Sequence, residues 1–119
     1  MASSSFPQQF DFSVWRGNSD EGADFTVTGD VDSDFTGYIG ILRVAPLRGA
    51  AFQIVTAVSL GASANIAIFK PRFTIAQTRN LVAGAVNAYE FEMRNPDETW
   101  KKTCFIGKIN GLGGLNLDV

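Results

Sequence analysis

Three aspartates at alternate positions are the residues of this chain whose spacing comes nearest to metal chemistry. Asp30, Asp32 and Asp34 carry carboxylate oxygens at positions one, three and five, as in a calcium-binding loop. The rest of that pattern is missing, because Phe35 stands where the loop requires glycine and Ile41 where it requires a bidentate glutamate. The competing interpretation is a solvated acidic turn between two strands, so the aspartates are only a weak candidate metal site.

Catalytic chemistry has little support in the composition. The chain has no histidine, which removes the commonest general base and metal ligand and the Ser–His and Cys–His nucleophile systems. Its other acidic pairs, Asp20/Glu21 and Asp97/Glu98, fall in predicted loops rather than around an apolar cleft. We therefore expect a protein without enzymatic activity and without a cofactor.

The single cysteine, Cys104, lies in the apolar run Cys104-Phe105-Ile106 and cannot close an intramolecular disulfide. Free cysteine is among the most buried residue types, and a buried thiol is a poor nucleophile. The position predicts a buried, unreactive thiol rather than a nucleophile or a ligand.

Length and composition predict one globular domain. The chain has 119 residues, of which 45% are hydrophobic and 18% charged, and ten phenylalanines supply an aromatic interior. The net charge is −2 with no dense Lys/Arg cluster, so nucleic acid is not an expected partner. No apolar stretch has membrane-spanning length, and the start resembles no signal peptide, so we expect a soluble protein made in a cytoplasm.

The segment from Ala88 to Ile109 predicts a β-hairpin. Tyr89, Phe91 and Met93 alternate with charged residues, and a polar turn at 95–98 reverses the chain. If Arg94 lies opposite Thr99, then Met93 meets Trp100 on the buried face and Glu92 meets Lys101 on the wet face. This register has one flaw, since it sets Lys102 opposite Phe91 on the core face. Either a bulge shifts the register after Lys101, or that face is partly open and meets a partner.

Five further strands and one short helix complete the predicted elements. Alternating patterns and turn residues place the strands at 10–15, 22–29, 38–44, 51–60 and 65–69. Residues 74–81 have helical character, with Thr74 as the cap, Ile75, Thr78 and Leu81 facing inward, and Gly84 at the exit. About seven short strands at this spacing predict an all-β fold: an immunoglobulin-like Greek-key β-sandwich with one crossover helix. We expect an N-terminal arm at 1–9, the sandwich at 10–110 and a C-terminal tail at 111–119.

Partner binding is expected at the two ends of the chain. Phe6 is an apolar residue in a polar terminal arm, so we expect it to be exposed. Trp15 falls on the otherwise polar side of its strand. The tail carries Leu112, Leu115, Leu117 and Val119, and the last three have the spacing of an added strand. Such a tail could pair with the open sheet edge of a neighbouring subunit. The alternative is that both termini are frayed ends without a docking role.

The order of motifs resembles a phage family, the small immunoglobulin-like domain at the N-terminus of baseplate upper proteins and related tail proteins. The resemblance rests on Val14-Trp15-Arg16-Gly17-Asn18-Ser19, on Asp34-Phe35-Thr36-Gly37-Tyr38 leading to Leu42-Arg43-Val44, on Leu81 to Gly84, on Tyr89-Glu90-Phe91 and on Phe105-Ile106-Gly107. It covers roughly residues 10 to 110. The family domain commonly precedes further fibre or receptor-binding regions, whereas this sequence stops just after it.

The resemblance implies a virion structural protein, assembled in the host cytoplasm and present in several copies in a symmetric assembly. Such a tail or baseplate adaptor would dock fibres, spikes or neighbouring tail or capsid subunits. Two alternatives remain open. One is a capsid decoration protein of the same fold, and the other is a carbohydrate-binding module with Trp15, Tyr38 and Trp100 as stacking faces. Their scatter over three separate predicted strands counts against the second.

Overall fold

The computed structural model describes residues 7–19, 23–45, 53–63 and 65–113, except for the side chains of 53–63 and of residue 85. The described chain is mostly β, with eight strands and one short helix. In chain order they are β1 (Gln8–Gln9), β2 (Phe12–Trp15), β3 (Phe25–Thr28), β4 (Ile39–Ala45), β5 (Gln53–Ser63), β6 (Ile66–Pro71), α1 (Ile75–Arg79), β7 (Gly84–Arg94) and β8 (Lys101–Leu112). The expected all-β class with one short helix is confirmed.

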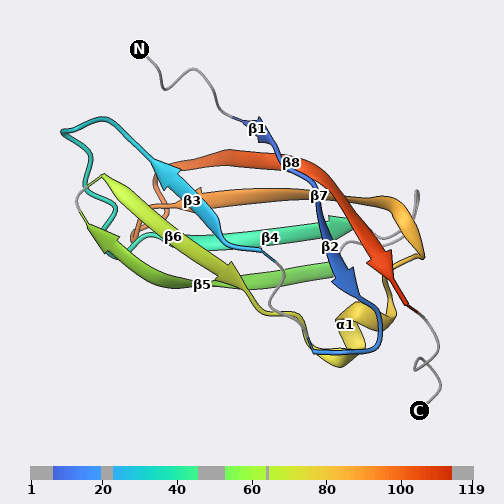
Figure 1. Cartoon of the computed structure of the whole chain (residues 1–119). Coiled ribbons are helices and arrows are strands. Elements are labelled where there is room, and N and C mark those ends of the chain that lie inside the picture. Colours follow the sequence, from blue (N-terminus) through green and yellow to red (C-terminus); the bar gives the residue numbers. More distant parts are fainter. Residues whose placement is uncertain (1–6, 20–22, 46–52, 64, 114–119) are drawn as a thin grey trace.

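The strands form one hydrogen-bonded path that folds into two layers (Figure 1). The path runs β1-β8-β7-β4-β5-β6-β3, and β2 follows β1 along the same edge of β8. The long strand β5 passes between the layers. Residues 53–57 pair with β4, residues 57–63 pair with β6, and a register irregularity lies between Ser59 and Gly61. β3 and β6 thereby cover the inner face of β4, β7 and β8.

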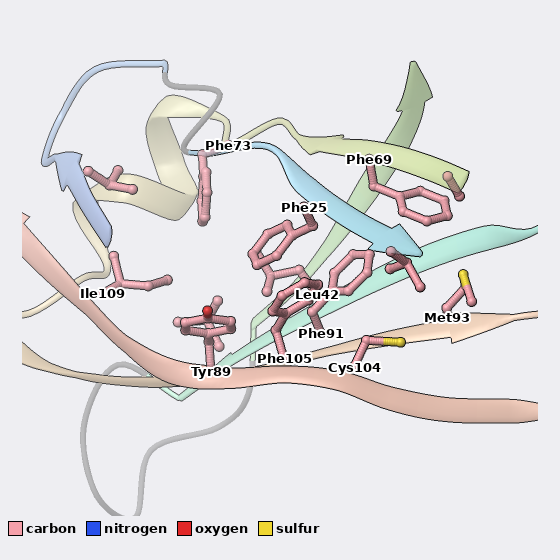
Figure 2. Close-up of a cluster of buried hydrophobic side chains, with 14 of the residues drawn as sticks. Phe25, Leu42, Phe69, Phe73, Tyr89, Phe91, Met93, Cys104, Phe105 and Ile109 are labelled. Atoms are coloured by element: carbon pink, nitrogen blue, oxygen red, sulfur yellow. The ribbon is translucent and has the colours of Figure 1, made fainter. Parts of the chain in front are cut away.

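Aromatic side chains fill the space between the layers (Figure 2). Phe25 of β3 stacks on Phe91 of β7, with ring centroids 4.5 Å apart and planes 6° from parallel. The same ring packs against Tyr89 at 5.8 Å and Phe105 at 5.1 Å. The alternating apolar and polar residues that predicted β3 also alternate in burial. Phe25 and Val27 are buried, and the threonines between them face solvent.

The β7–β8 hairpin forms, but its predicted register is wrong by two residues at the turn end. Arg94 lies opposite Lys101, not Thr99, and Met93 lies opposite Lys102. The ladder then shifts between Phe91 and Glu92, so that Cys104 is the extra residue of a β-bulge. A bulge after Lys101 was one of the two explanations for the misplaced lysine, and it is present. It lies past Lys102, however, so the exposed Lys102 still pairs with the buried Met93, and the bulge alone does not move the lysine off that face.

Helix α1 connects the two layers, as expected of the crossover. Thr74 caps it: the Thr74 side chain accepts a hydrogen bond from the Gln77 amide at 3.1 Å, and the Gln77 side chain accepts from the Thr74 amide at 2.8 Å. Thr78 and Leu81 are buried as predicted, but Ile75 is 47% exposed. The inward prediction for Ile75 is wrong because the five-residue helix buries only the side centred on Thr78, and Ile75 lies at its margin.

The N-terminal boundary also differs from the expectation. Gln8 and Gln9, assigned to a structureless arm, form β1 in parallel with Phe105 and Ile106 of β8. Two adjacent glutamines have no alternation that could predict a strand, because the pairing partner lies at the other end of the sequence. At the C-terminal side β8 continues to Leu112, two residues past the expected domain end.

Candidate functional site

Two of the predicted partner-binding residues, Trp15 and Leu112, lie side by side in the structure. They are paired in the parallel β2–β8 ladder. Trp15 is 55% exposed, and Leu112 is half-buried. The Trp15 ring lies over Gly113, where an added Cβ would come within 2.7 Å of it. We call this apolar surface of Trp15, Leu112 and Gly113 the Trp15 patch.

The remaining predicted partner-binding residues, Phe6, Leu115, Leu117 and Val119, lie outside the described residues. The expectation that the tail acts as an added strand stays a prediction. What the structure adds is the position of the last described residue, Gly113, which belongs to the Trp15 patch.

Arg16 fixes the position of the Trp15 patch, a role the sequence did not reveal. Its Nε donates to the Leu81 carbonyl at 3.2 Å, its Nη1 donates to the Gly113 carbonyl at 3.1 Å, and its amide donates to the Leu112 carbonyl at 2.9 Å. One side chain thus joins β2, the end of β8 and the segment after α1. No local pattern announces this role, because the two carbonyls that its side chain binds lie 65 and 97 residues away.

Asn87 holds the same end of the fold from inside and was likewise not predicted. It is completely buried, and its Oδ1 accepts from the Val82 amide at 2.8 Å. Its Nδ2 donates to the carbonyls of Val82 and Ile109, both at 2.9 Å. Gly111 permits this close approach, since a Cβ there would lie 2.4 Å from the Val82 carbonyl oxygen. The Trp15 patch therefore rests on a rigid support.

The acidic loop does not assemble a metal site among the described residues. Asp30, Asp32 and Asp34 lie in an open loop, and no group of three acidic, cysteine or histidine side chains gathers within the described ranges. Asp34 accepts a hydrogen bond from the Thr36 amide at 3.1 Å, and hydrogen bonding by Thr36 holds the pKa of Asp34 below its usual value. This is the geometry of a local turn in which the carboxylate bonds its own backbone.

The three candidate stacking residues do not form one surface. Tyr38 and Trp100 come together with ring centroids 5.8 Å apart, and Phe35 packs on Tyr38 at 5.2 Å. Trp15 is paired with Leu112 at the other end of β8. At about 3.3 Å per residue, β8 separates it from Trp100 by roughly 40 Å. A single short sugar cannot reach both tryptophans.

Glu92 is the most heavily paired carboxylate in the described chain. Its side chain is 9% exposed, Arg43 donates to it at 2.9 Å, and Arg94 donates to its second oxygen. Burial alone would raise the Glu92 pKa, but the hydrogen bonds and charges of Arg94 and Arg43 outweigh burial and lower it. Glu92 is therefore ionised at neutral pH with both oxygens engaged, and it cannot donate a proton there.

Cys104 is completely buried, as predicted. Burial raises the pKa of its thiol to about 11, despite smaller opposing effects of the Met93 backbone and of Lys102. At neutral pH the residue is therefore a thiol and not the nucleophilic thiolate. Its position in the bulge beside Phe105 serves packing.

A shallow hollow of about 440 Å³ lies on the outer face of the β4–β7–β8 layer. Its floor is formed by Ala45 and Ala88, which are directly paired across β4 and β7. Longer side chains surround them, among them Glu90, Ile106 and Lys108. The hollow exists because two methyl side chains meet where the neighbouring positions carry long ones. The sequence contains the two alanines, but it does not show that they are paired across β4 and β7.

Comparison of the chain with protein-family models, with curated proteins and with solved structures gives no match in any of the three. Within the described residues, no helix has the length and apolar character needed to cross a bilayer. The Trp15 patch and the outer sheet face are the two surfaces whose geometry bears on function.

Proposed function

We propose that this chain is a non-enzymatic structural protein of a phage particle, a tail or baseplate adaptor that docks fibres, spikes or neighbouring subunits. The observation that carries the proposal is the Trp15 patch, a rigidly supported, exposed aromatic surface at the end of the sheet. An exposed tryptophan whose surroundings are held by the hydrogen bonds of Arg16 and of the buried Asn87 is suited to an interface, because large rigid side chains lose little entropy on binding.

We also propose that the connectivity is an immunoglobulin-like Greek key. Support comes from the strand order: β4, β7 and β8 are neighbours in one layer, while β3 and β6 pair in the other. This order corresponds to the C-F-G and B-E neighbours of the immunoglobulin fold. β5 is hydrogen-bonded to both β4 and β6, and this joins the layers at one side, unlike two separate sheets.

The outer face of the β4–β7–β8 layer exposes several apolar side chains. Besides the half-buried Leu112, the outer face carries four large apolar residues that are each 38% or more exposed: Trp15, Ile39, Val86 and Ile106. Exposed apolar side chains on a sheet face favour a module that works within an assembly.

The test measures incorporation into particles. Tagged wild-type chain is produced in cells that assemble the phage particle, and purified particles are examined by quantitative mass spectrometry and by immunogold electron microscopy. We expect the chain at the tail or baseplate. For Trp15→Ala we expect at least a roughly tenfold loss in copies per particle, as for a residue central to an interface. The matched control is Val31→Ala, which alters an 86% exposed apolar residue in the β3–β4 loop.

Three results count against the proposal. Absence of the wild-type chain from purified particles would refute a virion role. Label on the capsid instead of the tail would replace the adaptor by a capsid decoration protein. Equal incorporation of Trp15→Ala and Val31→Ala would remove the Trp15 patch from the docking surface.

A further inference from the structure

The outer face of the β4–β7–β8 layer has a charge and shape pattern that is complementary to itself. Glu90 lies opposite Ile106, and Ala88 lies opposite Lys108, so four outward-facing residues form the corners of a rectangle on β7 and β8. Ala88 and Ile106 occupy one diagonal, and Glu90 and Lys108 occupy the other. One diagonal is apolar, and the other carries one negative and one positive charge.

The two charges of this rectangle are available for an outside partner. Both side chains are exposed, and neither forms an ion pair among the described residues. Arg43 is the cross-strand neighbour of Glu90, but its Nη1 is bound to Glu92 at 2.9 Å. An ion pair with Glu90 would weaken that bond. A partner of a single charge sign would be attracted by one corner of the rectangle and repelled by the other.

We propose that this face is an interface between two copies of the chain, with a two-fold axis in the plane of the interface along the Ala88–Ile106 diagonal. The rotation sets Glu90 of each copy against Lys108 of the other, so that both opposite-charge contacts form at once. Ile106 meets its counterpart on the axis, and the alanine-floored hollow lets the two sheets approach closely. The inference goes beyond the proposed function, since the interface can form whatever larger assembly the chain joins.

The crossing angle of the strands determines the buried area of this interface and hence its affinity. With strands about 4.8 Å apart and a rise of about 3.3 Å per residue, the strands of the two copies cross at roughly 70°, near the orthogonal class of sheet packing. The outer face of four strands is roughly 15 Å wide, so two such faces crossed at roughly 70° overlap over about 240 Å² and bury about 500 Å² in total. This area is below that of stable specific interfaces, so we expect a weak, reversible dimer that dissociates on dilution.

The test is sedimentation velocity of the full chain from about 10 µM to about 1 mM, the range in which a small interface is half-populated. We expect the weight-average mass of the wild type to approach twice the monomer at the high end. Glu90→Lys alone and Lys108→Glu alone each create two like-charge contacts per dimer, and each is expected to remain monomeric.

An equal mixture of the two variants is expected to recover the dimer. In the mixed pair, one contact joins the lysine introduced in the first variant to the glutamate introduced in the second. The other contact joins Lys108 of the first variant to Glu90 of the second, as in the wild type. Both contacts therefore have opposite charges again, although neither variant can form them with itself.

The control variant is Asp32→Lys, which changes the net charge as Glu90→Lys does but lies in the β3–β4 loop. Circular dichroism and thermal melts establish that every variant is folded. A wild type that stays monomeric at the highest concentration overturns the interface. A dimer undiminished in both single variants, or a mixture that fails to associate, overturns the pairing of Glu90 with Lys108. None of these results depends on particle incorporation, so this inference and the adaptor role fail separately.

Discussion

Glu92, between Arg43 and Arg94, is the residue at which charge contributes most directly to the stability of the described fold. Both arginines also hold other strands or turns: Arg43 is on β4, and Arg94 bonds Glu98 in the hairpin turn at 2.9 Å. A carboxylate with two guanidinium donors is stable when buried because each oxygen has a charged partner. The ion pairs therefore tie the β7–β8 turn to β4 across the outer face.

Replacement of Glu92 by glutamine tests this contribution. We expect Glu92→Gln to lower the free energy of unfolding by about 1–3 kcal/mol at pH 7, because two charge-assisted hydrogen bonds are weakened at a nearly buried site. The measurement is urea unfolding followed by tryptophan fluorescence. Glu90→Gln, on the same strand but exposed, is the matched control and should change the unfolding free energy by less than about 0.5 kcal/mol.

The same variants give a pH dependence with a fixed sign. Since the folded-state pKa of Glu92 is lowered, its contribution is fully present above the unfolded-state pKa of 4.5 and is lost as pH falls through the folded-state value. The gap in stability between wild type and Glu92→Gln should therefore shrink below about pH 4.5. A gap that stays constant down to about pH 3 would contradict the role of the ionised carboxylate.

Single residues differ in how far the sequence could predict them. Burial of Cys104 and exposure of Trp15 followed from the apolar and polar patterns around them, and the structure confirms both. The roles of Arg16 and Asn87 could not be predicted in this way, because both side chains bind carbonyls that are distant in the sequence. Nothing in the neighbouring residues distinguishes them from solvent-exposed polar residues. The hydrogen bonds that support the candidate site are thus a property of the folded chain only.

At the scale of elements, β1 and β2 form a broken edge strand beside β8. Between them Phe10 donates its amide to the Ile106 carbonyl at 2.9 Å, and the Tyr89 hydroxyl donates to the Phe10 carbonyl. Asp11 accepts from the Lys108 amide at 2.9 Å. The chain crosses β8 very closely at Gly107, where an added Cβ would lie 2.2 Å from the Phe10 carbonyl oxygen.

Gly107→Ala should therefore detach the N-terminal edge from the sheet. The contact is with backbone, so relief requires movement of residues 10–11 and not a side-chain rotation. We expect amide hydrogen exchange of Phe12 to Trp15 to rise by about tenfold or more, with the exchange of β4 much less affected. Thr103→Ala on the same strand, away from β1 and β2, is the control. Unchanged protection of β2 in Gly107→Ala would show that the close approach is not needed.

Most elements were predictable, whereas one register was not. Alternation located β3, β4 and β6 to within a few residues, since one face of each strand is buried. At the turn of the β7–β8 hairpin the predicted pairing was off by two residues, and a shift of two keeps every side chain on its own face. The pattern of hydrophobic residues therefore cannot separate the two registers at the turn.

On the scale of the whole molecule, the two layers are joined by rings that surround Phe25. Five rings place their centroids within 6.0 Å of it: Phe10, Phe12, Tyr89, Phe91 and Phe105. These rings come from the N-terminal edge and from both strands of the hairpin. The layer order could not be derived from the sequence, because alternation says which face is buried but not which strand covers it.

Phe25→Leu measures the coupling between the layers. We expect a loss of about 2 kcal/mol in the free energy of unfolding, because a leucine keeps the apolar character but gives up the contacts among the rings. Unfolding should remain a single transition by tryptophan fluorescence and circular dichroism. Thr26→Val, at the next position on the exposed face, is the control. Two separate transitions in Phe25→Leu would mean that the layers unfold independently.

The parallel pairing of β2 with β8 has a consequence for how the chain is made. A ribosome releases β2 long before it has synthesised β8, the one described strand to which β2 is hydrogen-bonded. Until then the N-terminal edge has no place in the sheet, and Phe12 and Val14 have no completed core to enter. The position of Trp15 depends on that pairing and therefore reports a late step of biosynthesis. The surface proposed for docking is displayed only by chains whose translation has passed residue 113.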